Sequence, residues 1–564
     1  MTPLLQIDDL TIAYRLADGS GFQAIRDYSL TMAPGEIVGI VGQSGAGKST
    51  IGKAVLGLMG ENATIEAGRI RLSGHDITRA RDVEAIRGRK VGYIYQNPMT
   101  ALNPVLTIGE QLLESIVTHT GRRGAAARAY AVELLEQAEV PQAAERLSKY
   151  PHQLSGGLCQ RIVFAIAICA RPALLIADEP TTALDVTVQK AVLATLERMA
   201  RKEGIGILLI THDMGVVAQM CDRVQVLRRG ELVEEGATRQ LLLHPAAAYT
   251  RQLMAAIPPM DRRLDRFDVI ERQADSPGRE RGIAYLRTAR DGFAPSGSAL
   301  LSVRGLSKTY PAPPRSGQDA FVALKDVSFD VRAGEVLGIV GESGSGKSTI
   351  GRCILGLQQP DAGAAITFRG RSLQPGRRDR AALARSLQCI FQDPYSSLNP
   401  RMSAAVNMTY ALVAHGLVAA RDARRLAGDL LEVVQLPRDA AGKMPHAFSG
   451  GERQRIGIAR ALAFRPELIF CDEPTSALDV TVQAEVLNLM KDLREMLGLT
   501  LVFVSHDLAV VRQITDRVHV MRQGQIVESG PTTTVLDRPS PYPRTAGHDA
   551  ASRDAGRSRI GQTT

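Results

Sequence analysis

The chain lacks several features that mark whole classes of protein. Its 564 residues include no tryptophan, and aromatic side chains make up only 4%. Its six cysteines lie far apart with no C-x-x-C pair, which argues against a zinc or iron–sulfur site and fits reduced thiols in cytosol. The longest apolar run, residues 162–177, is broken by Arg171-Pro172 and cannot span a bilayer. The first residues carry no basic segment and meet Asp8 early, so we expect no secretory signal.

The charge balance is basic but not concentrated in one place. The formal net charge is +9, which by itself would fit nucleic acid or an anionic membrane surface. The arginines are spread along the chain without a basic block or interleaved aromatic residues, so we expect no nucleic-acid partner and at most a weak attraction to a membrane surface. Hydrophobic content of 45% and charged content of 23% are ordinary for a globular protein, and the length is enough for two domains.

What the chain does have is an internal repeat. Four motifs of the first half return in the second half about 295 residues later. The repeated motifs are a glycine-rich loop ending in Lys-Ser-Thr (42–50 and 341–349), Ser-Gly-Gly (155–157 and 449–451), Asp-Glu-Pro-Thr (178–181 and 472–475) and His-Asp (212–213 and 506–507). A period this long exceeds that of a solenoid unit and indicates two homologous domains in one chain.

Each glycine-rich loop follows a short apolar strand and precedes a helix that we expect to begin at the lysine. Glycines in this setting let successive backbone N–H groups converge on phosphate oxygens at a helix N-terminus. Lys48 and Lys347 then reach the β- and γ-phosphates, while Ser49 and Ser348 offer hydroxyls to Mg²⁺. The predicted nucleotide-binding residues of the two loops are Gly42, Ser44, Gly45, Gly47, Lys48, Ser49, Thr50, Gly341, Ser343, Gly344, Gly346, Lys347, Ser348 and Thr349.

The Asp-Glu pairs predict the catalytic carboxylates. Asp178 and Asp472 end apolar segments, where the Walker-B carboxylate of P-loop enzymes holds Mg²⁺. Glu179 and Glu473 follow directly and are placed to polarise the attacking water. A solvated strand end would explain one such pair alone. The glycine loop upstream in both halves favours the catalytic interpretation.

The Ser-Gly-Gly motifs precede basic amphipathic helices. A serine before two glycines is a helix N-cap, and its open backbone amides also form a second site for an anion. Simple capping would explain the motif equally well if it stood alone. The residues predicted to contact nucleotide here are Ser155, Gly156, Gly157, Ser449, Gly450 and Gly451.

Composition and periodicity divide the chain into four segments. We expect a first nucleotide-binding domain at 1–260, a linker with some helix at 261–298, a second nucleotide-binding domain at 299–537 and a disordered tail at 538–564. Each domain should open with alternating strands and continue through a mainly helical middle region to buried parallel strands. The expected strands and helical regions are 5–14, 25–32, 37–41, 97–170, 173–177 and 205–210 in the first half, and 301–310, 322–331, 336–340 and 393–463 in the second.

In combination, these motifs resemble the nucleotide-binding domains of ATP-binding cassette (ABC) proteins. The resemblance also includes a glutamine after a strand (Gln96, Gln392) and Ala-Leu-Asp (183–185, 477–479), and it covers nearly the whole chain except linker and tail. It implies an α/β fold of two tandem P-loop NTPase domains. Each would have a RecA-like core, an antiparallel β subdomain and a helical subdomain, and would bind ATP with Mg²⁺.

The resemblance also implies roles that the residues alone do not. Tyr14 and Tyr310 would stack on adenine, Gln96 and Gln392 would touch Mg²⁺ and report to a membrane subunit, and His212 and His506 would contact the γ-phosphate. Outside this family, a lone histidine after an apolar strand is usually structural. The two halves would form a head-to-tail sandwich, with each ATP between one half's glycine loop and the other half's Ser-Gly-Gly signature.

A narrower resemblance is to the ATPase subunits of peptide and nickel importers. It rests on the glutamine loops (95–104 and 391–400), the Pro-His pairs before the signatures (151–152 and 445–446) and residues 244–251. It implies an ATP-hydrolysing subunit that drives uptake of a peptide-like solute, such as a di- or oligopeptide, glutathione or a nickel chelate. The partners would be two transmembrane permease subunits and an extracytoplasmic solute-binding protein. The location would be peripheral, on the cytoplasmic face of the bacterial inner membrane.

Two departures from this pattern matter. Residues 222–352 contain no cysteine, so the cysteine cluster of many such subunits is missing. The first signature continues with Leu158-Cys159 where the second has Glu452-Arg453, which predicts unequal ATP sites.

Three other classes of tandem-cassette protein are alternatives. A soluble ATPase acting on ribosomes is the main alternative, but it would carry a long, highly charged helical linker, whereas residues 261–298 contain Pro, Gly and mixed charge. A DNA-repair cassette would need zinc cysteines and large insertions. A fused sugar importer would have degraded motifs in its second cassette, and here they are intact.

Overall fold

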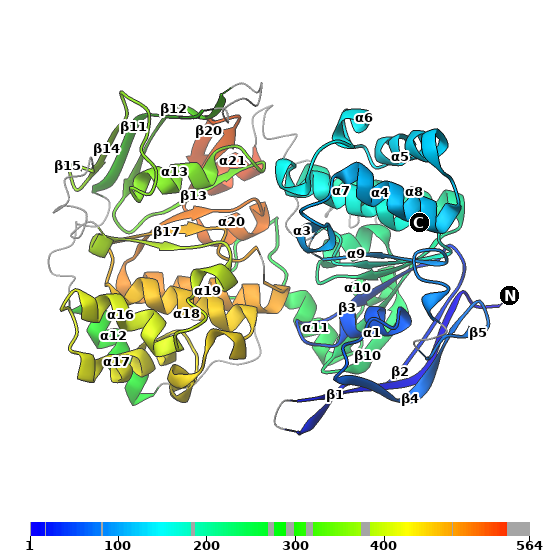
Figure 1. Ribbon diagram of the computed structural model, residues 1–564. Helices are drawn as coiled ribbons and strands as arrows, with labels where there is room; N and C mark the ends of the chain where they lie inside the picture. The colour runs from blue at the N-terminus through cyan, green and yellow to red at the C-terminus, as the bar shows by residue number, and fades with distance from the viewer. Residues whose placement is uncertain are drawn as a thin grey trace, which may run out of the picture. The chain divides into compact units, whose positions relative to one another are not determined.

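The computed structural model describes residues 2–16, 19–79, 83–96, 98–181, 186–268, 276–288, 298–311, 320–373, 384–476 and 478–538. The chain forms two compact units that divide between Met254 and Ala255 (Figure 1). Each unit holds one four-stranded and one six-stranded sheet, which confirms the prediction of two tandem α/β domains. The predicted tail lies outside the described residues except for Arg538.

The first unit opens with an antiparallel sheet. Its strand order is β2-β1-β4-β5, and β1 lies between β2 and β4. The strands are β1 (Leu5–Arg15), β2 (Gly21–Met32), β4 (Ala63–Leu72) and β5 (His75–Asp76). Buried and more exposed side chains alternate along residues 5–8 of β1 and 28–32 of β2, as expected for a sheet that faces the core on one side only.

The second sheet of this unit is mainly parallel, in the order β10-β9-β3-β8-β7-β6, with β10 antiparallel to β9. Its strands are β3 (Ile37–Val41), β6 (Val91–Ile94), β7 (Leu174–Asp178), β8 (Gly206–Ile210), β9 (Arg223–Arg228) and β10 (Glu231–Ala237). Every residue of β3, β7 and β8 is buried, as expected for strands covered on both faces.

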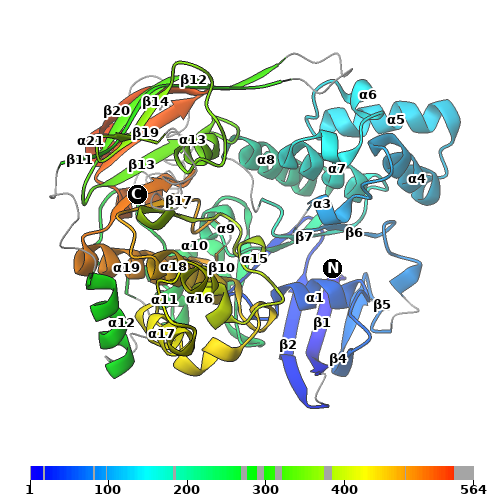
Figure 2. The same cartoon turned by 60° about the vertical axis from the view of Figure 1, so that its left-hand side comes forward.

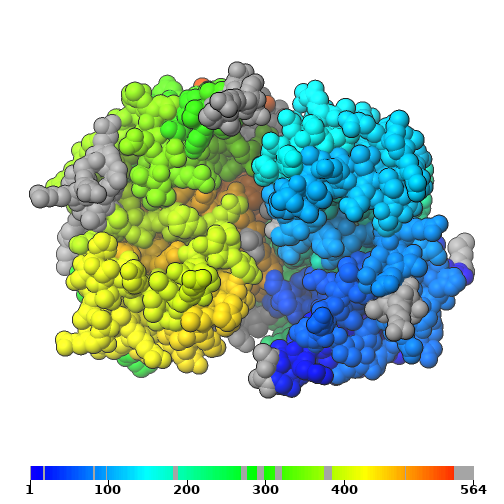
Figure 3. Space-filling model, viewed as in Figure 1, coloured from blue at the N-terminus to red at the C-terminus, as the bar shows by residue number. Residues whose placement is uncertain are grey.

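Helices of the first unit lie along the parallel sheet and form a separate helical layer. They are α1 (Lys48–Val55), α3 (Pro98–Ala101), α4 (Ile108–Thr120), α5 (Gly124–Gln137), α6 (Ala143–Arg146), α7 (Gly156–Ile168), α8 (Val186–Glu203), α9 (Met214–Met220), α10 (Thr238–Leu243) and α11 (Ala248–Ala255). In Figure 1, helices α4 to α7 and strands β1, β2 and β4 lie on opposite sides of the parallel sheet. The helical residues form a continuous light-blue to cyan surface on the face seen in Figure 3. The expected mainly helical region is therefore confirmed.

The second unit repeats both sheets, in the orders β12-β11-β14-β15 and β16-β17-β18-β13-β19-β20. The strands are β11 (Ala299–Tyr310), β12 (Phe321–Arg332), β13 (Val336–Gly341), β14 (Ala365–Phe368), β15 (Arg371–Ser372), β16 (Leu387–Ile390), β17 (Leu468–Asp472), β18 (Thr500–Val504), β19 (Arg517–Arg522) and β20 (Gln525–Pro531). The helices are α13 (Lys347–Ile354), α15 (Pro394–Ser397), α16 (Ala404–Ala414), α17 (Ala420–Val433), α18 (Gly450–Ala463), α19 (Val480–Leu497), α20 (Leu508–Ile514) and α21 (Thr532–Asp537).

Residues 256–268 and 276–288, here called the brace, belong to the second unit. They come from the segment around the predicted linker and include helix α12 (Pro277–Arg287). Figure 2 shows α12 beside α19 and above α17. Phe267 and Leu286 are buried in the same apolar core as α16 to α19. Among the described residues, no helix is long and apolar enough to cross a membrane.

Candidate functional site

The parallel sheet of the first unit brings the predicted motifs to one edge. Strands β3, β8, β7 and β6 are neighbours in this order and run parallel. Because parallel strands end at the same edge, ligands of open α/β sheets bind there. The strand ends lead, in the same order, to the glycine loop, His212, Asp178-Glu179 and Gln96. In the second unit β13, β18, β17 and β16 lead to the glycine loop, His506, Asp472-Glu473 and Gln392.

Glycine is required at both ends of the first loop. Gly42 has a φ of 152°, and a Cβ on it would lie 2.2 Å from the carbonyl oxygen of Leu227. Gly47 has a φ of 97°, and a Cβ there would lie 2.7 Å from the carbonyl oxygen of Ala24. A side chain at either place would force the backbone of the loop to move, so glycine is needed to keep this loop conformation.

The loop lysines begin their helices, as predicted. Lys48 is the first residue of α1, and its Nζ donates to the carbonyl oxygens of Gly42 at 2.7 Å and Gln43 at 2.9 Å. Lys347 begins α13 and holds the two equivalent oxygens of its own loop at 2.7 and 2.8 Å. Each ammonium is therefore fixed within its loop, at the positive end of a helix.

The other predicted loop residues divide into an exposed tip and a half-buried first helical turn. Ser44, Gly45, Ser343 and Gly344 are exposed, and Ser49, Thr50, Ser348 and Thr349 are half-buried.

The carboxylate of Asp178 is buried between two neutral donors. Ser49 Oγ donates to Oδ1 at 2.9 Å, and the Tyr93 hydroxyl donates to Oδ2 at 2.7 Å. Burial raises the pKa of Asp178, and the hydrogen bonds from Tyr93 and Ser49 offset part of this effect. Asp472 accepts the equivalent bond from Ser348 Oγ at 3.0 Å, and burial raises its pKa as well.

Glu179 lies at the centre of a polar cluster. Its φ of 48° is in the left-handed region, and its backbone N–H donates to the Ile210 carbonyl oxygen at 2.8 Å. Gln96 Nε2 donates to Oε2 at 2.6 Å, and His212 Nδ1 lies 3.1 Å from Oε1. Burial disfavours the charged imidazole, but the hydrogen bond and charge of Glu179 outweigh it and raise the pKa of His212.

The second cassette repeats this cluster. Glu473 has a φ of 46°, Gln392 Nε2 donates to its Oε2 at 2.9 Å, and His506 Nδ1 lies 3.1 Å from its Oε1. Burial would raise the pKa of Glu473, but the hydrogen bond and charge of His506 and the charge of Lys347 lower it below its usual value. The structure therefore brings the predicted glutamine, glutamate and histidine together in both halves.

The two Ser-Gly-Gly motifs are helix N-caps of unequal quality. Ser155 Oγ accepts from the Leu158 N–H at 3.4 Å. Ser449 Oγ accepts from the Glu452 N–H at 3.3 Å, and Glu452 Oε2 accepts from the Ser449 N–H at 2.7 Å, which completes a capping box. Because Leu158 has no carboxylate, the first signature cannot form the returning bond.

The next residue of each signature adds a second difference. Arg453 Nε donates to the Pro445 carbonyl oxygen at 2.7 Å, and its guanidinium lies 3.9 Å from the ring centroid of Tyr395 in the glutamine loop. At the equivalent place Cys159 contributes only a weak thiol bond to the Pro151 carbonyl oxygen, at 3.5 Å. The two signatures therefore differ in the helix cap and in the contact that the helix makes with the glutamine loop.

The predicted adenine-stacking tyrosines lie in the antiparallel sheets. Tyr14 pairs with Phe22 across β1 and β2, with ring centroids 6.3 Å apart. Ile25 of β2 lies against Gly47, so this sheet adjoins the glycine loop. Tyr310 ends β11, with the Lys308 ammonium 5.7 Å from its ring centroid. Both tyrosines are half-buried, and their stacking on adenine stays a prediction.

The Ala-Leu-Asp motifs are only partly visible. Residues 183–185 and Ala477 lie outside the described residues. Asp479 is the N-cap of α19 and accepts from the Val482 N–H at 3.1 Å.

Tyr93 is not among the site residues that the motifs predict. It lies in the middle of a short strand, and its contact with Asp178 depends on the register of β6 against β7. No local sequence signal carries that register. Only the alternation of the strand could have suggested that Tyr93 shares a face with the carboxylate.

Comparisons with known proteins show the family of this chain. A model of the ABC transporter family matches residues 25–182 and again 324–476. The chain is 42% identical to the glutathione import ATP-binding protein GsiA of Escherichia coli (strain K12) over 563 residues, which cover 96% of this chain and 88% of that relative. The identity to the protein of the same name from Salmonella typhimurium is also 42%, over 567 residues and with the same coverage.

Solved structures match single cassettes. The bacterial ABC transporter cassette MJ0796 is 28% identical, covers 42% of this chain and 98% of its own, and has a TM-score of 0.38. The cbiO1 protein of Clostridium perfringens, part of the ABC transporter complex cbiONQ, is 26% identical. The match covers 47% of this chain and 97% of cbiO1, with a TM-score of 0.39. On the strength of the family match and the full-length relatives, this chain belongs to the ABC transporter family, as an ATPase with two cassettes in one polypeptide.

Proposed function

We propose that this chain energises an importer for a peptide-like solute, with glutathione as the first candidate. The observation that carries the proposal is the complete cluster of glycine loop, aspartate, glutamate, glutamine and histidine at the sheet edge of both cassettes. The full-length relatives named for glutathione import support the choice of solute class.

The catalytic roles fall on two residues in each half. Glu179 and Glu473 act as the bases that polarise the attacking water, since each is fixed by its backbone and by a glutamine. His212 and His506 orient these carboxylates and contact the γ-phosphate. Gln96 holds the second oxygen of Glu179 and belongs to the glutamine loop, so it can report a permease contact to the base.

The residues also fit a magnesium ion. Each cassette presents a serine hydroxyl at the start of a helix beside a buried carboxylate, and hard cations prefer such oxygen ligands. Ser49, Asp178 and Gln96 would hold the ion in the first cassette, and Ser348, Asp472 and Gln392 in the second. When bound, Mg²⁺ neutralises negative charge on the β- and γ-phosphates. Lys48 and Lys347 add their charge on the loop side.

The proposed partners are two permease subunits and an extracytoplasmic solute-binding protein, at the cytoplasmic face of a bacterial inner membrane. The competing ribosome-associated function would need a long charged helix between the cassettes. Within the described part of that segment, α12 has 11 residues and packs on the second cassette instead.

Purification from membranes tests the assignment. We expect the chain to co-purify with its permeases and, in proteoliposomes, to hydrolyse ATP faster when the solute-binding protein is loaded. The reason is that contacts elsewhere in the complex must favour the hydrolysing state. Uptake of radiolabelled glutathione, a dipeptide and a nickel chelate in the same vesicles ranks the solutes. Full-speed hydrolysis by the isolated chain, with no response to membrane partners and co-purification with ribosomes, would support the soluble alternative.

A further inference from the structure

The metal-site aspartate is held differently in the two cassettes. In the first, Tyr93 donates to Asp178 Oδ2 at 2.7 Å and Ser49 donates to Oδ1 at 2.9 Å, so both carboxylate oxygens have a donor. In the second, Ser348 donates to Asp472 Oδ1 at 3.0 Å. No second side chain donates to that carboxylate within the described part of the unit.

Strand register identifies the residue that replaces Tyr93. Tyr93 lies opposite Ile176 across β6 and β7, and Cys389 lies opposite Phe470 across β16 and β17. The Phe470 ring approaches within 2.3 Å of the place where a Cβ on Gly351 would be, and the Tyr93 ring lies 3.6 Å from the same place on the matching glycine of α1. Each cassette therefore keeps one aromatic ring against the helix of its glycine loop. The second cassette lacks the phenol hydroxyl.

The Tyr93 side chain is half-buried and contacts a second aromatic ring. Its ring meets Tyr95 edge to face, with centroids 4.6 Å apart and an interplanar angle of 72°. A carboxylate already held at both oxygens loses less conformational entropy when a ligand arrives than one held at a single oxygen. Preorganisation of this kind favours the ligand that needs the carboxylate, which here is the metal rather than the nucleotide alone.

We propose that Tyr93 is a positioning residue of the first ATP site: it fixes Asp178 toward Mg²⁺ so that this site binds the metal–nucleotide complex at a lower Mg²⁺ concentration than the second. This rests on the metal roles of Asp178 and Asp472 under the proposed function. One hydrogen bond of ordinary net strength corresponds to about three- to tenfold in an equilibrium constant.

Equilibrium binding to the full-length chain tests this without relying on turnover. Both catalytic glutamates are changed to glutamine, and Lys347→Ala silences the second loop so that a fluorescent ATP analogue reports the first. In this background we expect Tyr93→Phe to raise the Mg²⁺ concentration for half-maximal binding about three- to tenfold. Binding in EDTA should stay unchanged, because the ring and the loop are intact.

Two matched variants complete the design. Tyr95→Phe removes the neighbouring hydroxyl, which makes no hydrogen bond to a carboxylate of the described residues, and should leave the Mg²⁺ curve unchanged. In the mirror background with Lys48→Ala, the pair Cys389→Tyr and Phe470→Ile transfers the first arrangement to the second cassette. This pair should lower the half-maximal Mg²⁺ concentration of the second site.

The outcomes separate the two levels of the proposal. An unchanged Mg²⁺ curve for Tyr93→Phe, or equal losses with and without Mg²⁺, would overturn the positioning role. An unchanged curve for Asp178→Asn would instead remove the metal from this carboxylate, and the role of Tyr93 with it. Normal hydrolysis by the glutamine variants would contradict the catalytic assignment alone, because the Mg²⁺ curves come from binding.

Discussion

The backbone at Glu179 and Glu473 is held in a conformation that glutamate rarely adopts. Their φ angles of 48° and 46° place both in the left-handed region, which costs about 1–2 kcal/mol for a residue with a Cβ. Neighbouring strands compensate, since the two N–H groups donate to Ile210 and Val504 at 2.8 and 3.0 Å. Strain that both halves retain fits a side chain whose direction matters for the reaction.

Glutamine at these two positions tests that interpretation. We expect Glu179→Gln with Glu473→Gln to bind ATP normally and to hydrolyse it about 10²–10⁴-fold more slowly, because the amide keeps the shape but is not a base. Nucleotide binding and phosphate release measured on the same preparation check this. Near-normal turnover in the double variant would show that the base lies elsewhere.

Protonation of His519, outside the nucleotide site, should make the stability of the protein depend on pH. It is 4% exposed, and neither ring nitrogen has a hydrogen-bond partner among the described residues. Burial, assisted by the charge of Arg517, lowers the pKa of His519 to about 4. The unfolded chain takes up this proton near the ordinary value of 6.5, so the unfolded state binds more protons between these values. The contribution of neutral His519 to the free energy of unfolding is therefore fully present above pH 6.5. It falls by about 3 kcal/mol as the pH drops to 4.

The first cassette supplies the matched variant. At the equivalent positions Gln225 accepts a hydrogen bond from the Tyr28 hydroxyl. We expect the pair Val327→Tyr and His519→Gln to remove that part of the acid sensitivity, as measured by urea unfolding at pH 7 and pH 5. The same loss of stability in parent and variant would mean that other groups carry it.

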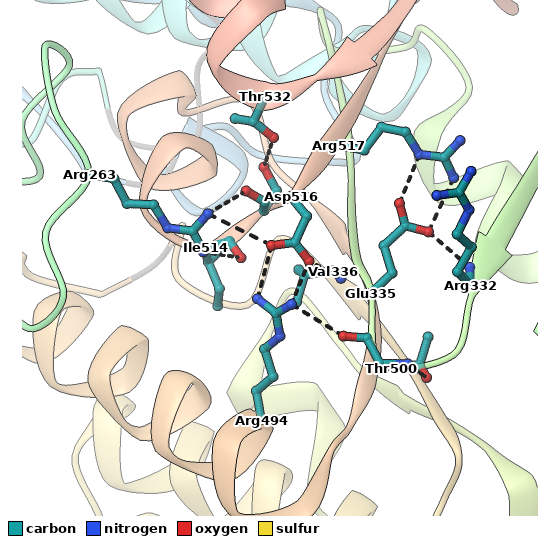
Figure 4. A network of polar contacts seen from close by, with 12 residues as sticks. Arg263, Arg332, Glu335, Val336, Arg494, Thr500, Ile514, Asp516, Arg517 and Thr532 are labelled. Carbon is teal, nitrogen blue, oxygen red and sulfur yellow. Dashed lines mark hydrogen bonds and ion pairs between the residues drawn. The ribbon is translucent and has the colours of Figure 1, made fainter. Parts of the chain in front are cut away.

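At the scale of elements, the brace ties helices of the second cassette to its parallel sheet. Two guanidinium groups contact the Asp516 carboxylate: that of Arg263 in the brace at 3.8 Å and that of Arg494 in α19 at 2.6 Å (Figure 4). The same carboxylate accepts a hydrogen bond from the Val336 N–H at the start of β13. On α12, Arg281 pairs with Asp429 of α17 at 2.8 Å. The segment thus joins the helical layer to the edge of the sheet opposite the nucleotide residues.

Asn488 of α19 is one of the residues that hold the brace in place. Its side chain accepts from the Phe267 N–H at 2.9 Å and donates to the Phe267 carbonyl oxygen at 3.0 Å, and Phe267 is buried. The first cassette has Ala194 at the equivalent position. We expect Asn488→Ala to lower the free energy of unfolding by about 2–4 kcal/mol, because two buried backbone groups lose their hydrogen-bond partners. Denaturant unfolding and hydrogen exchange of 276–288 measure this. Glu280→Ala, an exposed change on α12, should stay within about 0.5 kcal/mol, and an equal effect of both changes would contradict the brace.

These elements show what the sequence could and could not predict. Strands ending in motif residues, and helices beginning at Lys48 and Lys347, were predictable because strand, loop and helix are continuous in sequence. The brace was not predictable, because its contacts are distant in sequence. Arg266, for example, bonds to Asp492, which lies 226 residues further along the chain. Tyr93 was missed for the same reason: its function depends on a neighbouring strand rather than on its own motif.

At the scale of the whole molecule, the two cassettes should not contribute equally. The first signature lacks the capping box and the Arg453 contacts of the second, and the second metal site lacks the Tyr93 hydroxyl. If the head-to-tail pairing holds, both weaker features belong to the site of Lys347 and Glu473. We expect Glu473→Gln to reduce solute uptake less than Glu179→Gln in reconstituted vesicles. Equal or reversed losses would remove the inequality.

The head-to-tail pairing itself stays a prediction. Because both cassettes are part of one chain, the effective concentration of one for the other is about millimolar. Pairing within the chain should therefore exceed pairing between chains. In a background without native cysteines and with both catalytic glutamates changed to glutamine, Gln43→Cys and Glu452→Cys place thiols in the first loop and the second signature. With ATP and a short crosslinker we expect a looped monomer of altered gel mobility. The matched control exchanges Glu452→Cys for Leu158→Cys, the same position in the first signature, and should not crosslink. A covalent dimer, or crosslinking only in the control, would contradict pairing of the first loop with the second signature.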